Sequence, residues 1–288
     1  MRQFSTRQVV LGAIVCLGTL GVGGAGGQEP AGSSDLTRAA TVAPVADRST
    51  TGAGSRNRAA EDAIRPVAAE IIARMLEKNK QRLAALEHYE SERTYRVEYT
   101  GAGGEHHAQL RVRAEYTGPD RKRFTVVSES GSKFLCDKVL RRLLESEQEA
   151  GAQSNRTQTT LGPENYAADL VGEETVATAG GPVRTWVLRM TPKVDNKFTY
   201  RGKVWVSEDD YAVVRIQGEP AKSPPWWINH ASFESVYLRR GDVWLPAKNV
   251  SSSHVRIGGE ATLTIEYGTY PVVAVRALRP ADEVAVRQ

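Results

Sequence analysis

The side chains that most often carry out chemistry in proteins are scattered in this sequence and form no recognisable set. There are five histidines. His106 and His107 are adjacent in a segment that alternates like a strand, so they point to opposite faces and cannot share a metal ion. No HExxH motif is present, and only one cysteine follows the first 27 residues. The sequence therefore predicts no metal site, no cofactor and no catalytic histidine.

Nucleophilic chemistry is no better supported. There is no GxSxG motif, and Ser130 and Lys133 spell an SxxK without the motifs that accompany it in penicillin-binding enzymes. Cys136 lies in the apolar run FLCDKVL with no histidine nearby, which favours a small core residue over a nucleophile. Gly258 and Gly259 precede no helix start, so they are typical of a hairpin turn and not of a phosphate-binding loop. We expect a protein that is not an enzyme.

Aromatic residues are the more informative set, because they gather in the second half of the chain. Core packing accounts for most of them. Trp226 and Trp227 differ, because adjacent residues in an extended segment face opposite sides, so one ring lies at a rim or on an outer face. A pocket mouth or a membrane interface would use such a ring. The predicted ligand-binding residues, in a cavity or at its rim, are Trp186, Phe198, Trp205, Trp226, Trp227, Phe233 and Trp244.

Two helical segments are expected to position these residues. From about residue 59 to 90, apolar residues recur at steps of three and four with charges between them, which predicts one long amphipathic helix or two helices separated near Asn79. Pro66 is compatible only with the start of such a helix. A second, inserted helix is predicted over 132–150, where Leu140, Leu143 and Leu144 lie among charged residues.

The rest of the chain alternates with a period of two, which predicts strands. The turns between strands are too short for crossovers, so the strands are antiparallel. A sheet this wide curls, and the two helices must cover one of its faces. The eleven expected strands lie near residues 94–99, 110–116, 123–130, 164–174, 182–191, 197–207, 210–219, 228–239, 242–250, 251–258 and 261–270.

The two ends of the chain have a different composition from this α+β, mainly antiparallel β domain, which is expected over 59–275. Residues 1–27 combine two arginines, an apolar stretch of about a dozen residues and a small-residue run, the pattern of a secretory signal cleaved after Ala25 or Gly27. Residues 28–58 lack aromatic residues and read as a disordered linker, and 276–288 as a flexible tail. We therefore expect a periplasmic protein.

Charge excludes one class of partner. The net charge is +4, and the two arginines of the signal leave +2 on the rest of the chain. Lysine and arginine are interspersed with acidic residues, so no basic stripe is available for nucleic acid. We expect a monomer that does not bind nucleic acid.

Three short motifs in the second half resemble a known group of proteins. They are YRGKVWV at 200–206, YAVVRI at 211–216 and GDVWLP at 241–246. With the export signal, the N-terminal helix and the inserted helix, this layout is similar to the outer-membrane lipoprotein-sorting (LolA/LolB-like) superfamily. The resemblance covers about residues 60–270 in layout.

The resemblance implies a half-open β-barrel of about eleven strands, covered by an N-terminal helix and an inserted helix. It also implies a lipid-binding domain whose apolar cavity holds lipid or the acyl chains of a lipoprotein, without catalysis. Burial of an acyl chain is favourable by about 0.8 kcal/mol per CH₂, which is sufficient for capture from water. A membrane surface or an envelope protein are the further partners. The alternative is a periplasmic sensor or scaffold that binds a protein partner through the same fold.

Overall fold

The computed structural model describes residues 66–101, 103–118, 121–151, 156–222, 228–256 and 258–276. The helices are α2 (Ala68–Ala85), α3 (Lys133–Leu135), the π-helix η3 (Cys136–Leu140), α4 (Arg141–Gly151) and α5 (Arg156–Thr159). The strands are β1 (Leu86–Gly101), β2 (Gly104–Thr117), β3 (Arg121–Gly131), β4 (Tyr166–Thr178), β5 (Gly181–Pro192), β6 (Tyr200–Ser207), β7 (Val213–Pro220), β8 (Ile228–Arg240), β9 (Val243–Val255), β10 (Gly259–Tyr267) and β11 (Val272–Val275).

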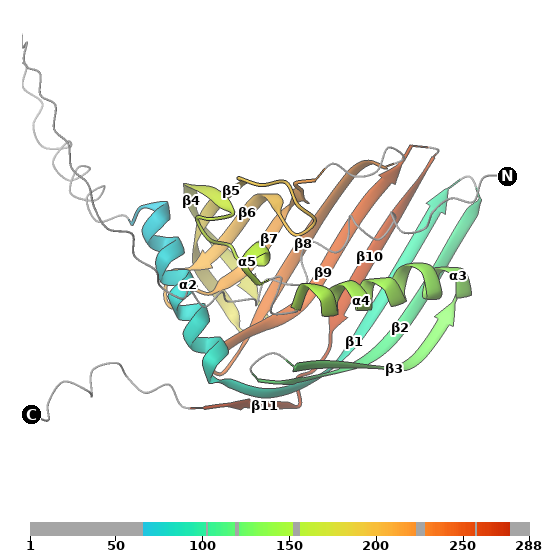
Figure 1. Cartoon of the computed structure of the whole chain (residues 1–288), viewed down its shortest axis with the longest axis horizontal. Coiled ribbons are helices and arrows are strands. Elements are labelled where there is room, and N and C mark those ends of the chain that lie inside the picture. Colours follow the sequence, from blue (N-terminus) through green and yellow to red (C-terminus); the bar gives the residue numbers. More distant parts are fainter. Residues whose placement is uncertain are drawn as a thin grey trace, which may run out of the picture. The chain divides into compact units, whose positions relative to one another are not determined.

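The strands form one sheet in the order β3-β2-β1-β10-β9-β8-β7-β6-β5-β4, and β11 pairs with the first residues of β1 (Figure 1). Each of these pairings is antiparallel. In the described part of the chain β3 and β4 do not pair with each other, so the sheet does not close. The predicted fold class, a half-open antiparallel sheet of eleven strands with covering helices, is confirmed.

Helix α2 forms because apolar residues recur on one side of it. Ile71, Ile72 and Met75 are buried, and Glu70 lies in the first turn, where a negative charge is favourable. Pro66 precedes the helix, as predicted. The predicted end near residue 90 is wrong: the helix ends at Ala85, and Leu86 already begins β1. None of the helices in the described ranges is long and apolar enough to cross a membrane.

The inserted helix is confirmed, and it contains a change of helical pitch. The Ser132 side chain accepts a hydrogen bond from the Leu135 amide and so caps the first turn. The π-helix η3 follows and buries Cys136, the predicted core cysteine. Beyond it α4 lies across the face of the sheet formed by β1, β2 and β3 (Figure 1).

The predicted number of strands, eleven, is correct, but two of the predicted strands do not exist as separate strands. Residues 242–250 and 251–258 were expected as separate strands, yet they form most of a single strand, β9, because Ser251–Ser253 continues the ladders with both β8 and β10. Strand β11 was not expected. The predicted signal, the linker, residues 59–65 of the predicted helix, residues 277–288 of the tail, and Trp226 and Trp227 lie outside the described residues.

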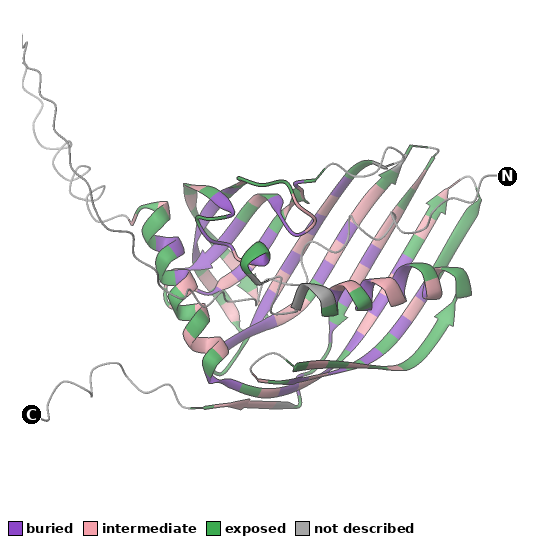
Figure 2. Cartoon of the chain, in the orientation of Figure 1, coloured by how far each residue is buried: buried purple, intermediate pink, exposed green. Residues whose placement is uncertain are grey.

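The core is divided into two clusters, each covered by one helix. Buried residues alternate with exposed ones along the strands, as Figure 2 shows. The α4 cluster consists of Leu86, Tyr89, Tyr95, Val97, Ala108, Leu110, Val112, Tyr116, Cys136, Val139, Leu140, Leu143, Leu144, Leu238, Val243, Leu245, Leu263, Ile265, Tyr267 and Tyr270. The α2 cluster consists of Ile71, Ile72, Met75, Leu161, Tyr166, Trp186, Leu188, Met190, Tyr200, Val204, Val206, Ala212, Val214, Ile216, Phe233, Tyr237 and Trp244.

Strand register places most of the strand residues of both clusters on one face of the sheet. Side chains directly opposite each other in neighbouring strands share a face. One such row begins at Tyr95 of β1 and passes through Ile265 of β10 to β9. From β9 it continues to β8, and then through Ile216 of β7 and Val204 of β6 to Leu188 of β5. We call this the apolar face.

Two opposed glycines allow close approach on this face. A Cβ on Gly202 would collide with the Gln217 carbonyl oxygen. A Cβ on Gly218 would lie 2.5 Å from the Arg201 carbonyl oxygen. The rings of Tyr200 and Phe233 meet edge to face beside this pair, with 5.2 Å between their centroids. The glycines therefore admit large neighbouring rings and a close approach of β6 and β7.

Candidate functional site

The structure brings three of the predicted aromatic residues together. Trp186, Phe233 and Trp244 all belong to the α2 cluster. Phe198 is buried but belongs to neither cluster, and the Lys197 ammonium lies 4.9 Å from its ring centroid. Three of the predicted residues therefore share the apolar face under α2.

Trp205 lies on the opposite face of the sheet. It stands between Val204 and Val206, which both belong to the α2 cluster, so alternation directs its ring the other way. Its indole Nε1 donates to Glu174 Oε2 at 2.7 Å, and the Arg215 guanidinium stacks 4.7 Å from its ring centroid. Trp205 is therefore held by polar partners on the face away from the helices.

An ion pair beneath α4 joins that helix to the sheet, and it was not predicted from the sequence. Glu147 of α4 lies with its Oε1 atom 2.5 Å from Nη1 of Arg93 on β1. The two side chains are 2% and 1% exposed. The Tyr95 hydroxyl donates to the other carboxylate oxygen of Glu147 at 2.8 Å. We call this group the α4 latch.

Aromatic rings and hydroxyls surround the latch arginine. The Arg93 guanidinium lies 4.8 Å from the ring centroid of Tyr267 and 5.3 Å from that of Phe124. Its Nε donates to the Ser91 hydroxyl at 3.2 Å, and Nη2 donates to Tyr89 at 3.4 Å. A desolvated cation needs such partners, because burying an unpaired charge is very costly.

The pKa directions agree with a charged latch. Burial alone would lower the pKa of Arg93, but the Glu147 carboxylate and the nearby tyrosines raise it well above its ordinary value. Burial and Glu147 raise the pKa of Tyr95 well above its ordinary value, so its hydroxyl keeps the proton that it donates. Helix α4 is therefore held to the sheet by a charged pair that has almost no exposure to water.

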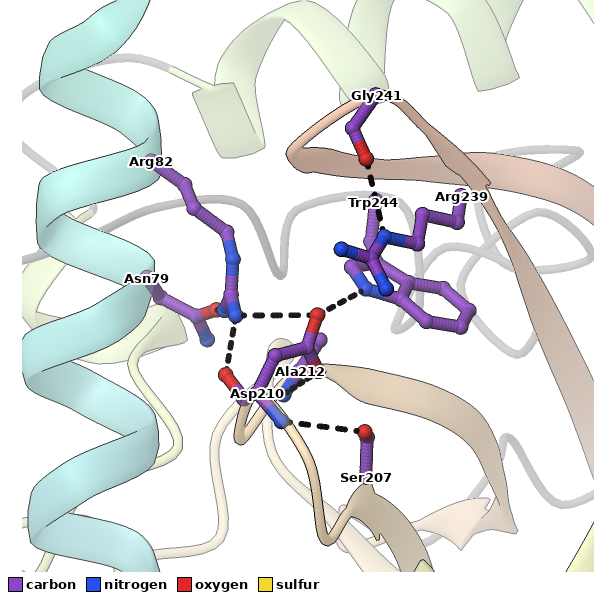
Figure 3. Close-up of polar contacts among 8 residues, drawn as sticks. All are labelled: Asn79, Arg82, Ser207, Asp210, Ala212, Arg239, Gly241 and Trp244. Carbon is purple, nitrogen blue, oxygen red and sulfur yellow. Dashed lines mark hydrogen bonds and ion pairs between the residues drawn. The ribbon is translucent and has the colours of Figure 1, made fainter. Parts of the chain in front are cut away.

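A second polar group attaches α2 to the turn between β6 and β7 (Figure 3). The Arg82 guanidinium donates to the Asp210 carbonyl and lies 3.4 Å from Asp210 Oδ2. That carboxylate oxygen also accepts from Trp244 Nε1 at 2.8 Å. Asn79, one helical turn before Arg82, accepts from its Nη1 at 3.1 Å. We call this group the α2 anchor.

Asp210 organises the turn as well as the helix. Its carboxylate accepts from the Ala212 amide at 3.2 Å, and its own amide donates to the Ser207 hydroxyl at 3.4 Å. Burial alone would raise the pKa of Asp210, but hydrogen bonds from Trp244 and Ser207 and the charge of Arg82 together lower it. The next residue, Tyr211, has a φ of 57°, and its ring lies tilted against that of Trp186 with 5.1 Å between the ring centroids.

Outside these two polar groups, histidine–carboxylate pairs are present among the described residues, but a metal site is not. Within the described residues, histidines, cysteines and acidic residues do not gather in a group of three or more that could hold a metal ion. His254 pairs with Glu260 at 2.9 Å and His230 with Glu219 at 3.6 Å, and all four side chains are between 49% and 69% exposed. These are solvated surface pairs of little energetic weight.

A signal in the sequence could have located both members of the α4 latch. The alternation of Tyr95 and Val97 extends backwards through Arg93 to Tyr89, which puts Arg93 on the apolar side of the strand. In the inserted helix, the spacing of Leu140, Leu143 and Leu144 continues to Glu147, which puts a carboxylate on the buried stripe. Two opposite charges at buried positions suggest a pair.

Comparisons with known proteins give likeness of fold only. No family model matches the chain, and no curated protein matches it. A DUF1329 family protein from Desulfovibrio piger is 14% identical, with 70% of this chain and 92% of that chain covered and a TM-score of 0.36. A putative outer membrane lipoprotein-sorting protein domain from Vibrio parahaemolyticus is 11% identical, with 73% and 94% covered and a TM-score of 0.35.

A LolA superfamily protein from Nitrosomonas europaea is 9% identical, with 75% of this chain and 96% of that chain covered and a TM-score of 0.29. The solved structures similar to this chain thus include the superfamily that its motifs resemble. At such low identities and TM-scores the likeness carries no inference about function, which must come from the residues of the chain itself.

Proposed function

We propose that this protein is a non-catalytic binding protein of the periplasm, which holds lipid or the acyl chains of a lipoprotein against the apolar face of its sheet. One observation carries the proposal. Most strand residues of both apolar clusters lie on a single face, and in the described residues that face is covered by helices and not by a second sheet. A helix can lift from such a face without breaking any hydrogen bond between strands.

In this proposal α4 is the movable cover. The apolar stripe formed by Leu140 at the end of η3 and by Leu143 and Leu144 of α4 packs on the sheet. Among the described side chains, the α4 latch is the deep polar attachment of this helix. Acyl chains would replace that stripe when the helix lifts. Burial of a chain is favourable by about 0.8 kcal/mol per CH₂, which offsets the cost of exposing the stripe. Helix movement would then set the rate of uptake and release.

The test is a titration of delipidated protein with a fluorescent fatty acid, cis-parinaric acid, together with native mass spectrometry of protein purified from its own membrane fraction. We expect saturable fluorescence enhancement and a co-purifying mass of lipid size. Val127→Asp is a matched control for an introduced charge, because Val127 is exposed and outside both clusters, whereas Leu263→Asp places the charge on the apolar face.

The control variant should bind like the wild type, and Leu263→Asp should lose binding while circular dichroism shows that it remains folded. The absence of saturable binding by the folded wild type, with no lipid mass, would overturn the proposal. Purification with a stoichiometric protein partner and no lipid would instead favour a periplasmic sensor or scaffold.

A further inference from the structure

Three polar side chains lie in the middle of the apolar face. Strand register places Asn249 of β9 opposite Ser235 of β8, and Ser251 of β9 opposite Phe233. Asn249 is 2% exposed, Ser251 4% and Ser235 5%. Polar groups buried to this degree need hydrogen-bond partners. We call these three residues the polar strip.

The polar strip satisfies only part of its own hydrogen-bonding capacity. Asn249 Nδ2 donates to the Ser235 hydroxyl oxygen at 2.7 Å, and the Ser251 hydroxyl donates to Asn249 Oδ1 at 3.4 Å. An amide has two N–H groups and a hydroxyl has one proton. The second Asn249 N–H and the Ser235 proton have no further partner among the described residues. Two buried donors are therefore available to an acceptor.

The strip separates the two apolar clusters. On the β10 side, Ile265 is opposite Asn249 and Leu263 is opposite Ser251, and both belong to the α4 cluster. On the β7 side, Ile216 is opposite Ser235 and belongs to the α2 cluster, as does Phe233. A narrow polar line thus runs between two apolar areas, each under its own helix.

This surface is complementary to an amphiphile that has a polar linkage between two apolar arms. We propose that the polar strip is a specificity site that donates hydrogen bonds to the neutral carbonyl of an ester or amide, while the arms extend onto the two clusters. The strip carries no charge, so a neutral carbonyl suits it better than a carboxylate or a phosphate. This inference rests on the proposed function, since it needs apolar chains to bind the apolar face.

The experiment compares two probes that differ only in the carbonyl. Dioctanoylglycerol carries two ester carbonyls, and di-O-octylglycerol replaces both with ether methylenes. Each is titrated as a competitor of cis-parinaric acid on delipidated full-length protein. We expect the ester to bind about tenfold more tightly, which corresponds to one or two net hydrogen bonds. A diacylated lipopeptide with octanoyl chains is a third competitor, and it distinguishes a lipoprotein from a free lipid as the source of the ester.

Variants identify the residues responsible. Ser235→Ala and Asn249→Leu should reduce the ester-to-ether ratio to about one, while binding of the ether is kept. Thr185→Ala is the matched control, because Thr185 is equally buried and its hydroxyl bonds to the Glu174 carbonyl, away from the strip. Ser251→Ala is the milder substitution should Asn249→Leu prove poorly folded by circular dichroism.

The outcomes separate the two proposals. Equal binding of ester and ether by the wild type would overturn the specificity site and leave lipid binding intact. An equal loss of preference in Thr185→Ala would also overturn it, because the effect would then not belong to the strip. If neither glycerolipid nor cis-parinaric acid binds, the proposed function fails, and the specificity site fails with it.

Discussion

Helices α4 and α2 are each attached to the sheet by an arginine and a carboxylate, but at different depths and with opposite polarity. Beneath α4 the helix supplies the carboxylate, Glu147, and the strand supplies Arg93, with both side chains 2% exposed or less. At α2 the helix supplies Arg82 and a turn supplies Asp210, with side chains 12% and 21% exposed. Comparing the two attachments therefore distinguishes the contribution of burial depth to stability from the contribution of the charges themselves.

Depth decides how each attachment responds to the loss of one partner. A buried charge left alone keeps its full desolvation cost, whereas a partly exposed charge regains water. The α4 latch is therefore stable only as a complete pair, while the α2 anchor is a set of separate, smaller contacts.

The largest effect is expected at the α4 latch. Glu147→Ala leaves Arg93 charged and unpaired in the apolar face and should lower the free energy of unfolding by about 3–5 kcal/mol, measured by urea denaturation. The double variant Arg93→Met, Glu147→Leu should recover most of this loss, because it removes both charges. A loss below about 1 kcal/mol in the single variant would show that the pair is hydrated in solution.

A smaller effect is expected at the α2 anchor. Asp210→Asn removes the charge that faces Arg82 but keeps a polar side chain that can accept from Trp244. Because Arg82 is partly exposed, we expect a loss of about 1–2 kcal/mol in the same denaturation assay. If this loss equalled that of Glu147→Ala, depth would not be what distinguishes the two attachments.

The α2 anchor should also respond to acid, through Asp210. The pKa of Asp210 is lower in the folded protein than its ordinary value, so its contribution to stability is complete above the unfolded pKa of about 3.9. The contribution is lost as the pH falls through the folded pKa. The stability difference between wild type and Asp210→Asn should therefore be constant near neutrality and shrink below about pH 4, as denaturation at a series of pH values will show.

The smallest effect is expected at the indole of Trp244. Trp244→Phe keeps an aromatic ring in the α2 cluster but removes the hydrogen bond to Asp210, at a cost of about 1 kcal/mol. It should also move the acid-dependent loss of stability to higher pH, because that bond helps to lower the pKa of Asp210. Trp205→Phe is the matched control: it loses a bond to Glu174 on the other face and should leave the Asp210 transition unchanged.

Much of the fold could be predicted, because alternation and turn residues are local signals. The hairpins joining β1, β2 and β3 and the inserted helix follow from them directly. The division of β9 failed because the serine run at 251–253 reads as a break, while its strand conformation depends on ladders with β8 and β10 that are distant in sequence. Strand β11 was missed for the same reason, since it exists by pairing with β1.

The candidate site was harder to predict, because composition does not reveal the face on which a residue lies. Trp186 and Trp205 were grouped by their type, and strand register separates them. The Arg82–Asp210 contact joins residues 128 positions apart, so no local pattern indicates it. The buried positions of Arg93 and Glu147 could have been predicted from the periodicity of their segments. A charged residue on an apolar stripe is, however, easily taken for an interruption of the stripe.

The open edges of the sheet have a mechanical consequence. In a closed barrel, the number of strands and their shear set a single radius. Here the described β3 and β4 are not joined to each other, so the curvature between them can change by small increments at each of the intervening ladders while every ladder keeps its hydrogen bonds. The sheet can thus widen or narrow as a whole without losing the pairing between any two neighbouring strands.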